Sequence, residues 1–300
     1  MRRRFAHCEF SKGALLFAVC AIIAATLLLP ARARAMPPWY TDYSAAYRQA
    51  MAEEKMLLLF FGDGAMEAMG DSLRQKSIDR DDVRRVLDQY VVAQLPSHAN
   101  AVVDGESIRL LDHASFSELN DGPGVAIIDL ANSGADYYGH VVTAIPFTPG
   151  KYYRYRPEHL PVLLTLPHGT LTQRTMIFAV RIHPEAPAST WGQQHPVLTA
   201  EADSHSRHQA EIAVQGHHNW ETRYQRITSR LPGGVSAVEV VAESWPDQGL
   251  VDSCVDCVDS WRQSPGHWSA VRERHPLFGF DIRRGRNGIW YATGIFGRRR

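Results

Sequence analysis

Residues 260–297 constrain the fold of this chain more than any other stretch. Apolar residues recur at helical spacing up to Trp261. In the following sequence Ser264-Pro265-Gly266, the proline restricts the backbone and the glycine makes it more flexible, so the helix is expected to end there. The next residue is a histidine, so the turn holds the backbone of His267 in a defined position. The pattern therefore predicts a helix, a turn and then one histidine that the turn holds in place.

A β-hairpin follows this turn. Residues 278–282 and 289–296 alternate like strands, and both flank Asn287-Gly288. Asparagine and glycine tolerate positive φ, which makes Asn-Gly a strong hairpin signal. We expect two antiparallel strands here and a third strand at 235–241.

The motif Trp261-x-x-Ser264-Pro-Gly-His267, followed by a glycine-centred strand and an aromatic strand ending in Ile-Phe-Gly, resembles the bacterial branch of the CAP superfamily. This family comprises the cysteine-rich secretory and pathogenesis-related proteins, with an SCP-like extracellular domain. Residues 200–217 resemble the opening helix of the family. The resemblance implies an α+β fold, a sandwich of a sheet between two helical layers, over residues 200–300.

The same resemblance implies a cleft built from two histidines and two acids. His217 would be the first histidine and His267 the second, while Glu239 takes the place of one acid. Valines replace the usual glycine and asparagine beside Glu239, so Glu243 is the alternative candidate for this acid. Ser264 occupies the position of the other acid.

The helical pattern from 205 to 227 gives a second reason to single out the first histidine. Its apolar and small residues share one face with His217, which predicts that this side chain points inward; a shift of one residue would give His218 this place instead. His205 and His208 form another pair three residues apart, which we interpret as a solvated surface feature.

Three functions fit these residues. His217, His267 and Glu239, with water, would bind a divalent metal such as zinc. A hydrolase of extracytoplasmic peptides or esters would use that metal, or Ser264 as the nucleophile and His267 as its base. A binding module would hold a lipid, a peptide or a cell-wall component without turnover, and we expect this function rather than an enzyme.

Residues 1–35 read as a secretory signal, with three arginines, an apolar run and a small-residue cleavage site. The alternative is an uncleaved membrane anchor. Cleavage would leave 26 basic and 31 acidic residues, a net charge of −5, which does not favour nucleic acid as a partner. We therefore expect a secreted or periplasmic protein that meets a membrane only if the segment is retained.

Helical and strand patterns alternate over residues 36–167, beginning with a helix capped by Thr41 or Asp42 and a buried strand at 56–61. Trp39, this order and Asp121-Gly-Pro123 resemble a thioredoxin-like α/β domain, which usually carries a cis-proline at that point. Met66 and Met69 occupy the positions of its redox cysteines, and a thioether cannot become a thiolate. The domain is therefore predicted to be redox-inactive.

Helix-start packing by Met66 and Met69 is the favoured interpretation of this pair, with soft-metal binding as the alternative. Residues 168–199 are predicted as a linker with a strand at 176–182. Cys254 and Cys257 lie on the apolar face of the helix before Trp261, which favours buried thiols over a redox pair. A strained disulfide between the two is the remaining alternative.

Overall fold

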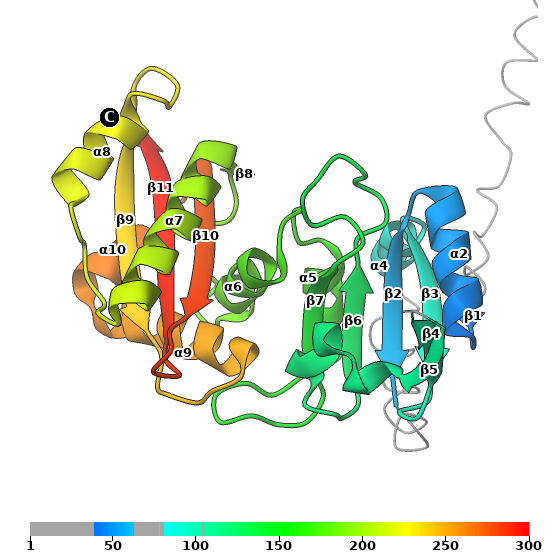
Figure 1. The fold of residues 1–300 in the computed structure, drawn as a ribbon. Helices are drawn as coiled ribbons and strands as arrows, with labels where there is room; N and C mark the ends of the chain where they lie inside the picture. Colours follow the sequence, from blue (N-terminus) through cyan, green and yellow to red (C-terminus); the bar gives the residue numbers. More distant parts are fainter. Residues whose placement is uncertain (1–38, 63–77, 79–80, 104, 300) are drawn as a thin grey trace, which may run out of the picture. The chain divides into compact units, whose positions relative to one another are not determined.

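The described part of the chain contains two mixed β-sheets, of five and four strands, and a separate two-stranded sheet (Figure 1). This computed structural model describes residues 39–62, 78, 81–103 and 105–299, which belong to one compact unit. Within those described ranges, no helix is both long enough and apolar enough to span a bilayer. The predicted signal at 1–35 and the methionines Met66 and Met69 lie outside the described residues.

The first sheet has the strand order β1-β3-β2-β6-β7. Strands β1, β2 and β3 are mutually parallel, whereas β6 is antiparallel to β2 and β7 is antiparallel to β6. The strand bounds are β1 Trp39–Tyr40, β2 Met56–Phe61, β3 Tyr90–Leu95, β6 Gly124–Ile128 and β7 Val141–Pro146. The predicted buried strand at 56–61 is confirmed as β2.

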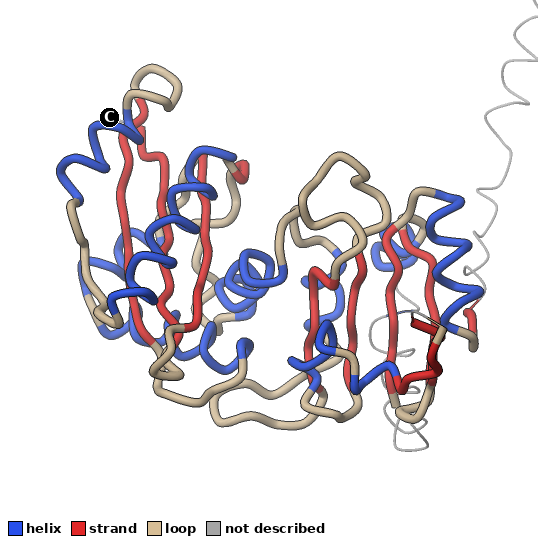
Figure 2. The backbone as a smooth tube through the Cα atoms, in the orientation of Figure 1, coloured by secondary structure: helices blue, strands red, loops and turns tan. Residues whose placement is uncertain are grey.

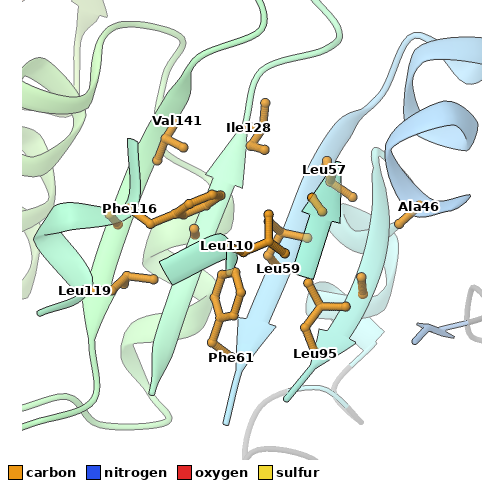
Figure 3. Close-up of a cluster of buried hydrophobic side chains, with 14 of the residues drawn as sticks. Ala46, Leu57, Leu59, Phe61, Leu95, Leu110, Phe116, Leu119, Ile128 and Val141 are labelled. Carbon is orange, nitrogen blue, oxygen red and sulfur yellow. The ribbon is translucent and has the colours of Figure 1, made fainter. Parts of the chain in front are cut away.

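Strand β2 is buried along its whole length, as its unbroken apolar sequence predicts. Alternate residues Leu57, Leu59 and Phe61 join a core with Ala46 and Ala50 of α2 (Tyr43–Glu53), seen in part in Figure 3. Helices α4 (Asp81–Leu87) and α5 (His159–Leu164) lie towards the other face, where the hydroxyl of Tyr90 donates to the carbonyl of Leu164. The predicted cap is confirmed, because Asp42 accepts the backbone N–H of Ala45.

Several features of this half were not predicted. Strands β4 (Asn100–Val103) and β5 (Glu106–Arg109) pair as a separate hairpin, and the 3-10 helices η2 (Leu110–Asp112) and η3 (Ala114–Leu119) follow it. The expected cis-proline at Pro123 is wrong, since the described residues contain no cis peptide bond.

The predicted strand at 176–182 is also wrong, because these residues belong to helix α6 (Leu171–Ile182). A capping box between Thr170 and Gln173 begins the helix. Residues 173–180 are all buried, since α6 packs against β7, α9 and β10. A helix covered on every side has no polar stripe, so its sequence looks like a buried strand.

Two consecutive residues of α6 connect it to both sheets. Gln173 Nε2 donates to the buried carboxylate of Asp281 in β10 at 2.9 Å. Arg174, which is 1% exposed, donates to Thr143 Oγ1 in β7 and to the carbonyls of Leu166 and Pro167. The predicted linker segment thus contains a buried helix with polar contacts to either side.

The second sheet has the strand order β8-β10-β11-β9. Its strands are β8 Gln193–Gln194, β9 Val235–Glu243, β10 Leu277–Arg284 and β11 Trp290–Arg299. The predicted hairpin is confirmed, because β10 and β11 pair antiparallel along both strands, and β9 pairs antiparallel with β11.

Helices cover both faces of this sheet (Figure 2). Helices α7 (Pro196–Ile212) and α8 (Trp220–Thr228) pack on one face through a core that includes Leu198, Ile227 and Ile295. Helices α9 (Leu250–Gln263) and α10 (Pro265–Arg272) pack on the other, where Trp261 contacts Phe280. The arrangement is a helix–sheet–helix sandwich.

The predicted continuous helix from 205 to 227 is wrong. Helix α7 starts earlier, with Pro196 in its first turn, and ends where Ala213 adopts a φ of 55°. The N–H of Gly216 bonds to the side chain of Gln209, and α8 begins only at Trp220. His217 therefore lies in the connection between two helices, and helical periodicity does not explain its position.

Replacing Arg174 with methionine should lower the free energy of unfolding by about 3 kcal/mol, because the carbonyls and the Thr143 hydroxyl lose their buried donor. The matched Arg207→Met removes only the exposed ion pair with Asp203 and should cost less than about 1 kcal/mol. Urea unfolding of both variants measures the difference. Equal losses would show that α6 does not depend on this arginine.

Candidate functional site

A buried carboxylate is the centre of the candidate site. Glu239 lies on β9, and its side chain is 1% exposed. Arg223 Nη2 donates to Oε2 at 2.5 Å, and His217 Nδ1 lies 3.0 Å from Oε1. A buried charge is tolerated only when it is paired and hydrogen-bonded, and Glu239 has a partner on each oxygen.

These partners decide the charge of Glu239. Burial alone would raise its pKa, but the hydrogen bonds from His217 and Arg223 and the charge of Arg223 outweigh that effect and lower the pKa below its usual value. The carboxylate is therefore ionised near neutral pH. Because the carboxylate can only accept, His217 must donate through Nδ1–H, which leaves Nε2 of its neutral ring as an acceptor with a lone pair.

The second predicted histidine meets the first at this lone pair. His267 lies in the first turn of α10, and its Nε2 is 3.2 Å from Nε2 of His217. Burial and, to a smaller extent, the charge of protonated His217 lower the pKa of His267, while Glu239 acts in the opposite direction. Both effects that lower the pKa favour the neutral imidazole, which is the form that binds metals.

The pair of Nε2 atoms fits one small divalent cation. Two nitrogens at about 2.0–2.1 Å from a tetrahedral zinc are roughly 3.3 Å apart, close to the observed 3.2 Å. Glu239 bonds to the opposite ring nitrogen of His217, and a carboxylate in this place commonly orients a histidine that binds a metal. Groups of three or more metal-binding side chains do not occur among the described residues, so water or a bound ligand would complete the coordination.

The other predicted site residues do not take part in the contact between His217 and His267. Glu243 is exposed at the end of β9, about 13 Å along the strand from Glu239. Ser264 ends α9 and precedes α10, with no side-chain capping bond. Among the hydrogen bonds of the described residues, none joins the Ser264 hydroxyl to His267.

His205 was predicted to lie at the surface, and this prediction is wrong. The residue is 2% exposed, and its Nε2 donates to the carbonyl of Gly216, which fixes the loop that carries His217. Burial is the main reason that its pKa falls to about 4. The rings of His208 and His218 pack beside it, with centroids 6.3 and 6.0 Å from its own.

Arg223 was missed by sequence reasoning. It lies on α8 four residues before the buried Ile227, so both side chains occupy the inward face of the helix. An arginine on the same helix face as a buried apolar residue is the sequence signal for Arg223, because a buried arginine needs an acidic partner nearby in the core.

The two cysteines of α9 are free and fully buried, which confirms the interpretation as core residues. Burial raises the pKa of both thiols well above the usual value. Neither thiol is therefore poised for redox chemistry.

The free energy of unfolding should fall as the pH drops from about 6.5 towards 4. The unfolded chain protonates His205 at the ordinary histidine pKa, whereas in the folded protein this residue stays neutral until the pH nears its lowered pKa of about 4. His205→Gln keeps a donor for Gly216 but removes this proton site. The wild type should lose roughly 2 kcal/mol more than the variant between pH 7 and pH 4.5. Urea unfolding at several pH values measures this, and parallel curves would contradict it.

No family model and no curated protein matches this chain. Among solved structures, an outer surface protein from Borrelia burgdorferi is similar, with 19% identity over 36% of this chain and 78% of that chain. The TM-score is 0.30, and a likeness this weak carries no argument about fold or function.

Proposed function

We propose that this chain is an extracytoplasmic binding protein that holds a divalent metal ion, such as zinc, between His217 in the α7–α8 connection and His267 of α10. One observation carries the proposal: two imidazole Nε2 atoms lie 3.2 Å apart, and a buried ionised carboxylate holds the far nitrogen of one ring. Arg223 fixes that carboxylate in turn.

The chain's own groups prepare the metal ligands. Glu239 orients His217 and selects the tautomer whose Nε2 is free. Burial keeps His267 neutral by lowering its pKa. A bound ion would supply a Lewis-acidic attachment point for an oxygen atom of a ligand. His217 is 42% exposed at its side chain, so such a ligand can approach from solvent.

The family assignments belong to this proposal as well. The order β1-β3-β2-β6-β7, with three parallel strands followed by two antiparallel ones, supports a thioredoxin-like first domain. The helix–sheet–helix sandwich around β9, β10 and β11 supports a CAP-like second domain. The apolar N-terminal segment supports secretion or a periplasmic location.

Binding without turnover is favoured over hydrolysis. Nucleophilic catalysis requires a base in hydrogen-bond reach of the nucleophile. His267 directs Nε2 at His217, and the Ser264 hydroxyl has no hydrogen bond to either ring among the described residues. The ligand classes that we propose are a lipid, a peptide or a cell-wall component.

Calorimetric titration of metal-free protein with zinc should show one site per chain. His217→Ala and His267→Ala should each weaken binding at least about 100-fold, because one imidazole remains. His208→Ala is the matched control, since this histidine packs in the neighbouring ring cluster but lies outside the pair, and it should bind as the wild type does. Absence of zinc binding, or equal binding by all variants, would exclude the site.

Glu239→Gln should weaken zinc binding by about 10- to 100-fold without abolishing it, because the amide cannot hold the tautomer of His217 as a carboxylate does. The same titration measures the effect, and circular dichroism checks the fold. Unchanged affinity in a folded variant would show that the carboxylate does not support the ligand.

A further inference from the structure

A cavity of about 390 Å³ opens in the first half of the chain, away from the histidine pair. Helix α2 forms one wall, the hairpin of β4 and β5 forms another, and η3 with the ends of β6 and β7 closes the inner side. This volume lies in the range of small-molecule sites.

The inner surface of the cavity is apolar. Four residues that line it also belong to the buried core and are labelled in Figure 3: Leu110, Phe116, Ile128 and Val141. Val102 of the hairpin lines it from the outside and is 70% exposed. Water in such a space gains few hydrogen bonds, so an apolar group would displace it favourably.

Three polar side chains around this cavity offer a hydrogen-bond donor or a positive charge. Arg48 lines it, is exposed, and pairs with no carboxylate of the described residues. His113 accepts the backbone N–H of Ser115 at Nδ1, so its neutral ring carries the proton on Nε2. Burial and, to a smaller extent, Tyr47 raise the pKa of Tyr43 to about 12, which keeps that hydroxyl protonated.

Aspartate and glutamate do not occur among the described residues that line the cavity. An arginine at the mouth of an apolar cavity, with no carboxylate partner in the described part of the chain, complements a ligand with an apolar body and one negative end. We propose that this cavity binds a small apolar monocarboxylate, with the chain or ring against Phe116 and Val141 and the carboxylate at Arg48. This site is independent of the histidine pair.

Octanoate and octanol serve as matched probes, because they share an apolar chain and differ in the charged end. Calorimetry or ¹H–¹⁵N NMR titration should show that octanoate binds more tightly than octanol. Arg48→Gln should weaken octanoate about tenfold and leave octanol unchanged. Arg286→Gln, which alters another exposed arginine far along the sequence in the hairpin turn, should change neither.

A second variant tests the cavity itself. Ser44→Trp places a large ring on the α2 wall at a partly exposed position and should block both probes. His217→Ala should bind octanoate as the wild type does, which separates this site from the proposed metal site. The proposal is overturned if octanoate fails to bind, if Arg48→Gln and Arg286→Gln behave alike, or if Ser44→Trp leaves binding intact in a folded protein.

Discussion

The carboxylate of Glu239 is the constraint on which the second half of the structure depends. It lies inside the sandwich between β9 and α8, where an unpaired charge would be strongly unfavourable. Arg223 must therefore face inward, which fixes the rotation of α8. His217 satisfies the remaining oxygen, which fixes the loop between α7 and α8. The geometry of the histidine pair therefore follows from the need to give one buried carboxylate its hydrogen-bond partners.

The same loop is held from a second direction. His205 donates to the carbonyl of Gly216, and Gln209 accepts the N–H of that glycine. Both residues are buried on α7, so the helix positions the loop through its backbone while Glu239 positions it through a side chain. Binding groups supported by such surrounding contacts need little rearrangement on binding a ligand.

The site was predictable from the sequence in part. The turn before His267 and the strand that carries Glu239 are local patterns, and the family resemblance selected His217. The helical phase used to turn His217 inward was wrong, because Ala213 ends α7 with positive φ and no glycine marks that position. Arg223 and His205 were not found, since charged or polar residues on helices usually face solvent.

The fold was predictable where each element has one buried face or a clear turn. Strand β2, the hairpin of β10 and β11 and the apolar stripe of α9 follow from local sequence. Helix α6 could not be recognised, because burial on every side removes the helical period. The β4–β5 hairpin is short and largely exposed in β5, so it lacks a strong alternating pattern.

The tautomer of His217 tests the central claim most directly. Long-range ¹H–¹⁵N NMR of the metal-free protein near neutral pH distinguishes a protonated Nδ1 from a protonated Nε2. If Glu239 fixes the ring as the hydrogen bond indicates, His217 will carry its proton on Nδ1, and zinc will shift the Nε2 resonance. A ring protonated on Nε2 alone would contradict the account, because its lone pair would then face the carboxylate instead of His267.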